Sequence, residues 1–449
     1  MAEAEDGNQS WPRRTFSGRP WRVVAAALVL SVLSVLALFL VLLALWRTGV
    51  VEAPMVVRDL LGDGPKTLNL VMVMPSDEKR DQFDEGLKLA MDEVNAAGGL
   101  AGLPITLKRE VEDAYSEDAQ LEVVVADTLA LADRVSSMKD LLAVTGHWTS
   151  ATALPASSVY NRRGVLYLSS HARSSRLTNR GFNYIFSLQL NNADTASMMA
   201  HYAITEGMRK FVVLGDDTDY GQHTATMFSG WATLGGGDVL FRGSVTSYRR
   251  SVDRLLLYFL DNDVFAKDDI DAFFIASSSV QQTAHFIRRA RELGLTMPIL
   301  GPGYIFSSEI VRLVGKDKMK DVAGVSIYDE RALTPKARAF VEAYKRTYDK
   351  PPDQMAAVGY DAVHLLAHAV AQAGSYDASK LADYLRIMRH EKVFVGATGP
   401  LVFNVNGRVT DTQAFIVRHD GTNFHTVASY QKPLDWDPGG LLQRQDYRP

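Results

Sequence analysis

From Thr67 onward the chain alternates short apolar runs with longer segments of helical periodicity, and this alternation constrains its fold more than any other feature. In the first unit, the run Leu68–Met74 reads as a buried strand. Apolar residues from Phe83 to Val94 then recur at helical spacing until two glycines at 98–99 end the helix. Strands that alternate with helices in this way predict parallel sheets covered by helices on both faces. Because the alternation runs twice along the chain, we predict an α/β fold of two doubly wound lobes with a cleft between them.

In doubly wound sheets, ligands bind in the crevice beyond the carboxyl ends of the strands. Several segments that follow directly on expected strands carry small, polar or aromatic side chains. They are residues 146–152, 169–175, 215–221, 277–279 and 301–304. We therefore expect these segments to line the cleft.

The segment Leu141–Thr152 is the most informative of these. An apolar run ends at Gly146, and the hydroxyl residues Thr149 and Ser150 then begin a helix-compatible stretch. The start of a helix leaves backbone N–H groups free and carries partial positive charge, so it suits a carboxylate or another anion. The alternative is an ordinary N-cap, in which Thr149 or Ser150 bonds to its own helix and binds no ligand.

Composition narrows the classes of function. The chain has 449 residues, no cysteine and a formal net charge of −4. Its length and its hydrophobic content of 47% allow two or three domains with a sizeable core. The negative charge provides no bulk electrostatic attraction for nucleic acid. The lack of cysteine excludes disulfides, thiol catalysis, Cys-ligated zinc, iron–sulfur clusters and a lipid-modified Cys anchor.

The segment 23–46 carries no charged residue, and its only polar members are two serines. A helix of this length spans a bilayer, with Trp21 and Trp46 at the two interfaces. Arginines are concentrated before the segment, so the positive-inside rule keeps residues 1–22 in the cytoplasm. A cleaved signal peptide is the competing interpretation, but Leu43–Arg47 makes a poor cleavage site. We expect an uncleaved signal anchor in a bacterial inner membrane, with the main domain in the periplasm.

Seven segments then occur in a recognisable order and spacing. They are Phe83–Gly99, Gly146–Thr152, Leu154–Ser157, Arg176–Gly181, Asp216–Gly221, Arg289–Gly294 and Gly399–Gly407. Each is unspecific by itself. Together, over residues 67–430, they resemble the type 1 periplasmic solute-binding proteins, specifically the branched-chain amino-acid-binding (leucine/isoleucine/valine-binding) family.

The resemblance implies two Rossmann-like lobes that are joined by three crossovers and close over a small solute. It places residues 67–189 and 328–409 in the first lobe, and residues 190–327 and 410–432 in the second. The remaining expected parts are a cytoplasmic tail (1–22), the transmembrane anchor (23–46), a tether (47–66) and a polar C-terminal tail (433–449).

The resemblance also implies roles for individual residues. Ser150, in the loop with Trp148 and Thr149, matches the serine that holds the ligand carboxylate. Tyr220 matches the aromatic residue of the second lobe that closes over the ligand. Ala172 matches a position whose backbone contacts the ligand amino group.

Two positions depart from the family pattern. The small hydroxyl residue after Ala172 is Arg173 here, and the acid that pairs with the ligand ammonium falls at Gly303. Because an unpaired buried ammonium is costly, a carboxylate or dicarboxylate paired with Arg173 in a fork geometry fits better than an aliphatic amino acid. The alternative is a surface Arg173 whose side chain leaves the cleft. Tyr304 either fills the space of the missing acid or packs in the core, and Ser278, where the family often has an aromatic residue, leaves that wall more open.

No motif indicates catalysis, a metal or a cofactor. His364 and His368 are four residues apart on an expected helix, but no third ligand is in view, so we interpret them as structural. Asp216, Asp217 and Asp219 lack the spacing of a calcium loop and read as turn residues before the next helix. We therefore expect that the protein is not an enzyme.

The favoured function is a membrane-tethered, extracytoplasmic solute-binding protein that presents a small carboxylate-bearing molecule to an ABC-type transporter permease or to a membrane sensor. The alternative is an interaction scaffold whose cleft binds nothing. The missing acid at Gly303 and the charged loop Ser76–Asp81 both favour that alternative.

Overall fold

The computed structural model describes residues 64–76, 82–112, 121–245, 249–260, 269–329, 334–388, 392–431 and 444–445, together with Ser31, Val32 and Ser34. The expected anchor at 23–46 therefore lies outside the described residues except for those three. Residues 77–81 of the charged loop lie outside them as well. Within the described ranges, every helix falls short of the length or the apolar character that a bilayer crossing requires.

The first lobe is built on a five-stranded parallel sheet in the order β2-β1-β3-β4-β5. Its strands are β1 (Leu68–Met74), β2 (Ile105–Val111), β3 (Leu141–Gly146), β4 (Tyr167–Ser169) and β5 (Ile185–Ser187). The helices of this lobe are α3 (Phe83–Ala96), α4 (Leu121–Ser136), α5 (Ser150–Arg163), α11 (Pro335–Tyr348), α12 (Gln354–Ala373) and α13 (Ala378–Ile387).

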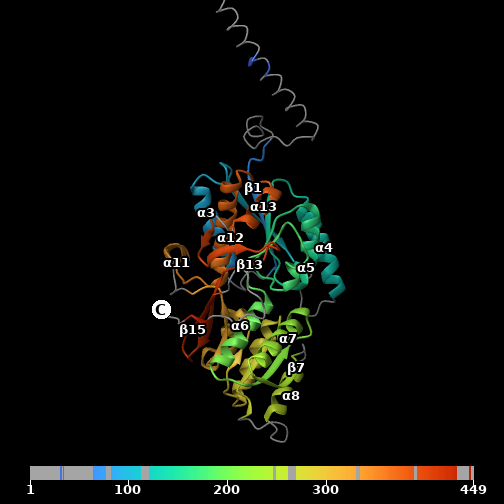
Figure 1. The fold of residues 1–449 in the computed structure, drawn as a ribbon, viewed down its shortest axis with the longest axis vertical. Helices are drawn as coiled ribbons and strands as arrows, with labels where there is room; N and C mark the ends of the chain where they lie inside the picture. Colours follow the sequence, from blue (N-terminus) through green and yellow to red (C-terminus); the bar gives the residue numbers. More distant parts are fainter. Residues whose placement is uncertain are drawn as a thin grey trace, which may run out of the picture. The chain divides into compact units, whose positions relative to one another are not determined.

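Side chains of the central strand β1 alternate between two apolar cores. Leu70 and Met72 pack into the core that contains α3 and α12, whereas Val71 and Val73 pack into the core that contains α4 and α5. All four side chains are buried. This is the period-two pattern of a strand that is covered on both faces, and the helices lie on opposite sides of the sheet in Figure 1.

The second lobe has an eight-stranded sheet in the order β16-β15-β14-β10-β9-β8-β6-β7. Its strands are β6 (Lys210–Gly215), β7 (Asp238–Ser244), β8 (Ala272–Ala276), β9 (Ile299–Leu300), β10 (Val322–Ser326), β14 (Gln413–His419), β15 (Phe424–Gln431) and β16 (Arg444–Gln445). Strands β6 to β10 are parallel, as predicted. Strands β14 to β16 pair antiparallel, which corrects the prediction of wholly parallel sheets. The segment 433–449, expected as a polar tail, contains β16.

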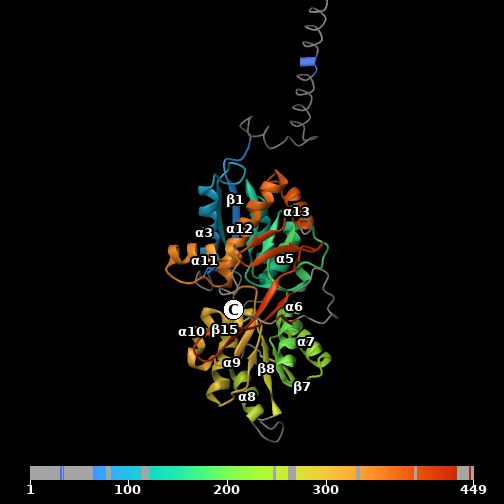
Figure 2. The same cartoon turned by 60° about the vertical axis from the view of Figure 1, so that its left-hand side comes forward.

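Helices cover both faces of this second sheet as well (Figure 2). They are α6 (Asn192–Thr205), α7 (Asp219–Leu234), α8 (Arg249–Leu260), α9 (Val280–Glu292) and α10 (Ser308–Val314). On the face of α6 and α7, the ring of Phe228 stacks on Phe274 of β8 with a centroid distance of 3.9 Å. On the opposite face, Phe273 packs against Phe259 and Phe286 from α8 and α9.

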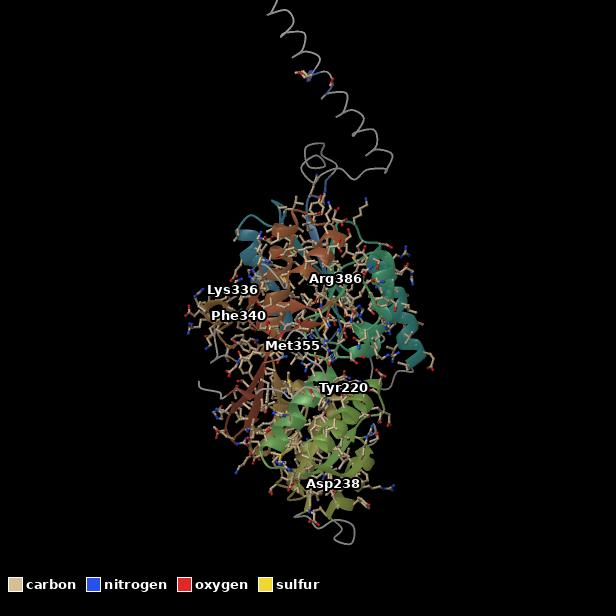
Figure 3. All side chains as sticks on the ribbon, viewed as in Figure 1. Tyr220, Asp238, Lys336, Phe340, Met355 and Arg386 are labelled. Carbon is tan, nitrogen blue, oxygen red and sulfur yellow. The ribbon has the colours of Figure 1, made fainter. Side chains whose placement is uncertain are left out.

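In the described part of the chain, the polypeptide passes between the lobes after β5, after β10 and after β13 (Val409–Thr410). The last of these strands belongs to a small antiparallel sheet with β11 (Phe394–Gly396) and β12 (Gly399–Phe403). Gln354 forms hydrogen bonds to the crossings after β5 and after β10. Its Oε1 accepts from Ser326 Oγ at 2.8 Å and its Nε2 donates to Gln189 Oε1 at 3.2 Å. The next residue, Met355, lies near the side of the first lobe that faces the second (Figure 3).

Candidate ligand-binding site

The loop between β3 and α5 is held from behind by a buried acid–imidazole pair. Glu112 follows β2 directly, and its Oε2 lies 3.0 Å from Nδ1 of His147. Its other carboxylate oxygen accepts the backbone N–H of Trp148 at 2.9 Å. Nε2 of His147 lies 2.9 Å from the hydroxyl of Tyr160 in α5. The chain of contacts from β2 to α5 therefore fixes the backbone on which Trp148, Thr149 and Ser150 stand.

The charge state of Glu112 follows from these contacts. Burial alone raises the pKa of a carboxyl group, but His147 and the hydrogen bonds from Thr152 and the Trp148 N–H outweigh burial. Together they hold the pKa of Glu112 below its ordinary value. Glu112 is thus an ionised carboxylate whose acceptors serve His147 and the Trp148 N–H of this protein rather than a ligand.

Thr149 occupies the N-cap position of α5, but its side chain makes no capping hydrogen bond. Its Oγ1 is buried and has no hydrogen-bond partner among the described residues. The interpretation of this loop as an ordinary side-chain cap is therefore wrong for Thr149. A buried hydroxyl without a partner costs free energy, so this group is suited to a ligand atom.

The segment after β4 lies against the start of α5. The Ser174 N–H donates to Ser150 Oγ at 3.2 Å, and the Arg173 carbonyl accepts from the Asn192 N–H at 2.8 Å. Ala172, whose backbone is expected at the ligand amino group, has its side chain buried in the core of the first lobe. These contacts leave the Arg173 side chain to extend away from the first lobe.

Arg173 reaches the second lobe beside Gly303. A Cβ built on Gly303 would lie 3.0 Å from Nη1 of Arg173 and would overlap the carbonyl oxygen of Val325. The alternative of a surface arginine whose side chain leaves the cleft is therefore wrong. Burial lowers the pKa of the Arg173 guanidinium, and the neighbouring Tyr220 and Tyr304 oppose this effect. Arginine nonetheless remains charged in proteins.

Two tyrosines of the second lobe surround this guanidinium. Tyr220, at the start of α7, lies on the side of its lobe that faces the first (Figure 3). Its hydroxyl is buried and has no hydrogen-bond partner among the described residues. Tyr304 differs, because its hydroxyl accepts the Ser277 N–H at 2.9 Å. Burial raises the pKa of both phenols, so both hydroxyls are neutral donors at physiological pH.

A model of the family described as periplasmic binding protein matches residues 79–423. The chain belongs to the periplasmic binding protein family. The chain is 25% identical over 335 residues to the leucine-, isoleucine-, valine-, threonine- and alanine-binding protein of Pseudomonas aeruginosa, which covers 73% of this chain and 82% of that relative. It is 24% identical over 350 residues to the leucine-specific-binding protein of Salmonella typhimurium, and the match covers 78% of this chain and 88% of that relative. These relatives are solute-binding proteins, not enzymes.

Two solved structures show the same fold. The branched-chain amino acid transporter substrate-binding protein of Streptococcus pneumoniae, in complex with isoleucine, matches with a TM-score of 0.69 and 22% identity over 82% of this chain and 100% of that one. A solute-binding protein of an ABC transporter from Rhodopseudomonas palustris, in complex with 3,4-dihydroxybenzoic acid, matches with a TM-score of 0.68 and 20% identity over 83% and 99%.

This periplasmic binding protein has an acid near the two tyrosines, but its oxygens are fully used. Asp216 follows β6, and one carboxylate oxygen accepts the N–H and the hydroxyl of Thr218. The other accepts the Ser277 hydroxyl and both the N–H and the hydroxyl of Ser278. A carboxylate has about four acceptor positions, so none is left for a ligand ammonium. Ser278, expected as an open wall, is instead tied to Asp216 through both of its donors.

The two helical histidines lie in this protein's first lobe and make separate hydrogen bonds. Nε2 of His364 lies 3.1 Å from Glu93 Oε2, and Nε2 of His368 lies 2.8 Å from the Tyr384 hydroxyl. Within the described ranges, no group of three or more His, Cys, Asp or Glu side chains is placed to hold a metal ion.

Of the predicted residues, Arg173, Tyr220, Gly303 and Tyr304 come together between the lobes; we call this set the Arg173 cluster. Trp148 stands beside His171 at a ring-centroid distance of 4.9 Å. Sequence reasoning missed Glu112 and the saturation of Asp216. An acid directly after an expected strand was the available signal for Glu112, but its partner His147 is remote in sequence.

Proposed function

We propose that this protein is an extracytoplasmic solute-binding protein that captures a small carboxylate-bearing molecule, an amino acid or an organic acid, by closure of its two lobes. Thr149, Ser150 and the free N–H groups of the first turn of α5 hold the carboxylate. Tyr220 closes over the ligand from the second lobe. Relatives support this ligand class, because the Streptococcus protein holds isoleucine and the Rhodopseudomonas protein holds 3,4-dihydroxybenzoic acid, and both solutes carry a carboxyl group.

The observation that carries the proposal is the buried Thr149 hydroxyl that caps nothing. Natural proteins satisfy nearly all buried polar groups, so an unused hydroxyl at a helix N-terminus favours a ligand acceptor there. The alternative of a scaffold with a non-binding cleft gives no reason to keep this donor at the site.

A ligand screen of the purified full-length chain tests the proposal. Aliphatic amino acids, dicarboxylates and aromatic acids are added in turn, and the melting temperature is followed by differential scanning fluorimetry. A true ligand at one hundred times its dissociation constant stabilises the folded state by about 2.7 kcal/mol. No shift with any of the three classes would contradict the proposal and favour the scaffold.

Thr149→Val is expected to weaken carboxylate binding about tenfold while leaving the ligand-free protein equally or more stable. The substitution keeps the shape of the side chain and removes a hydroxyl that has no protein partner among the described residues. Calorimetric titration and urea unfolding measure the two effects. Thr152→Val is the matched control, because that hydroxyl has protein acceptors within reach, the Thr149 carbonyl at 3.1 Å and the Glu112 carboxylate, and its loss should cost stability. A ligand-free Thr149→Val protein that is clearly destabilised would assign Thr149 a structural role instead.

We further propose that the apolar segment 23–46 anchors the protein in the inner membrane, with residues 1–22 in the cytoplasm. A permanent anchor suits a protein that is held beside a membrane complex, either a transporter permease or a sensor. Alkaline carbonate extraction of bacterial membranes tests the anchor. The full chain is expected to stay in the membrane pellet, and its release into the supernatant would contradict the anchor.

A further inference from the structure

The Arg173 cluster contains both positions that depart from the family pattern, Arg173 and Gly303, and the structure places them in contact. The guanidinium comes from the first lobe, and the position beside it in the second lobe has no side chain. A Cβ on Gly303 would overlap the Val325 carbonyl oxygen and would lie 3.0 Å from Nη1 of Arg173. The absence of a side chain at Gly303 and the presence of the long cation at Arg173 therefore fit each other sterically.

The guanidinium has no acceptor of its own among the residues that the structure describes. In the described part of the chain, the structure gives the Arg173 side chain neither a hydrogen bond nor an ion pair, although Arg173 is half-buried and the neighbouring Tyr220 hydroxyl is fully buried. Asp216 lies near both tyrosines of the cluster, but its carboxylate oxygens already accept from Thr218, Ser277 and Ser278. Even a half-buried cation loses hydration that a counter-charge would replace, so an anion would complete the cluster.

Tyr220 supplies a second donor at the same place. Its hydroxyl is buried without a partner among the described residues, and its ring centroid lies 6.4 Å from that of Tyr304. The Tyr304 hydroxyl already accepts from Ser277, so its oxygen is partly used. A fixed fork of guanidinium N–H groups next to a free phenol hydroxyl is a donor set for a carboxylate.

We propose that Arg173 and the Tyr220 hydroxyl bind an anionic group of the solute, and that the physiological solute is an organic acid without an ammonium group. This inference rests on the proposed solute-binding function and narrows its ligand class. A zwitterionic amino acid would bring its ammonium toward the guanidinium, and the acid described near the cluster, Asp216, has no acceptor position left to pair with it. An organic anion supplies the acceptor that Arg173 and Tyr220 lack.

Matched pairs of ligands that differ only in the amino group test the proposal by calorimetric titration of the full-length chain. The pairs are leucine with 4-methylpentanoate, and glutamate with glutarate. In at least one pair, we expect the affinity for the acid without the amino group to exceed the affinity for its amino acid partner by about 30-fold or more. Arg173→Met is expected to abolish this preference. Arg162→Met, an exposed arginine at the other end of α5, is expected to retain it.

Arg173→Lys keeps the positive charge and provides a second variant if Arg173→Met fails to fold. It is expected to bind the organic acid more weakly than the wild type but to prefer it still. Binding of both leucine and glutamate that is as tight as or tighter than that of their partners would overturn this inference alone, as would a preference for the organic acid that persists in folded Arg173→Met. Failure of every ligand to bind would overturn the proposed function and this inference with it.

Discussion

Replacement of Glu112 with Ala is expected to lower the free energy of unfolding by about 4 kcal/mol at pH 7. The substitution leaves a buried His147 without its acid and a Trp148 N–H without its acceptor. Because these two residues lead directly into Thr149 and Ser150, carboxylate binding should weaken as well. Urea unfolding followed by circular dichroism measures the stability, and calorimetric titration measures the affinity.

Glu110→Ala is the matched control, two residues earlier in the chain. Its carboxylate pairs with the exposed Arg134 at 3.0 Å, and a surface pair of this kind contributes at most about 1 kcal/mol. Equal losses in the two variants would show that the buried pair behind the loop has no special importance.

The pH dependence of the same site has a definite sign. Because the pKa of Glu112 is lower in the folded protein than its unfolded value of about 4.3, the folded state binds fewer protons there. Its contribution to stability is therefore present above that pH and lost as the pH falls through the folded pKa. The difference in stability between the wild type and Glu112→Gln should shrink below about pH 4. A difference that stays constant from pH 7 to pH 3 would contradict an ionised Glu112.

Gly146→Ala is the second change with a large expected effect, a loss of about 3 to 4 kcal/mol. Gly146 ends β3 with a φ of 100°, a region that residues with a side chain rarely adopt. A Cβ at this position would also overlap the carbonyl oxygen of Val73 in β1. That oxygen accepts the His147 N–H at 2.7 Å, so the clash falls on the hydrogen bond that starts the loop before α5.

Gly98→Ala separates the backbone strain at positive φ from the steric overlap with a neighbouring carbonyl. Gly98 has nearly the same φ, 102°, but a Cβ there would meet no atom within 4 Å. Its substitution should cost only the backbone strain, about 1 to 2 kcal/mol. Urea unfolding of both variants measures the excess at Gly146. Equal losses would show that the Val73 carbonyl moves aside and that the close approach of β1 and β3 is not a constraint.

The elements of the fold were largely predictable because they depend on local periodicity. The strand Leu68–Met74 has the bounds that the sequence predicts, and the helix expected from Phe83 to the glycines at 98–99 is α3, Phe83–Ala96. The short strands β5, β11 and β13 were missed, since two or three residues carry too little pattern. The antiparallel addition of β14 to β16 was also missed, because pairing direction depends on how the last segment returns to the sheet.

The candidate site was predictable only in part. The hydroxyl residues after Gly146 and the charge reversal at Arg173 and Gly303 were visible in the sequence. The hydrogen bonds from Ser278 to Asp216 were not visible in it. A polar residue at the end of a strand has the same sequence pattern whether it faces a ligand or a neighbouring loop. The same ambiguity concealed the role of Glu112 behind the binding loop.

The sequence by itself determined the alternation of strands and helices, the position of the loop before α5 and the placing of a glycine at 303 and an arginine at 173. These features are encoded within a few neighbouring residues. Only the tertiary structure decided that Thr149 leaves its own helix uncapped, and that Arg173 reaches the second lobe without an acceptor among the residues described there. Both outcomes depend on contacts between residues that are far apart in the chain, and the free energy of a buried polar group is set by those contacts rather than by its sequence neighbours.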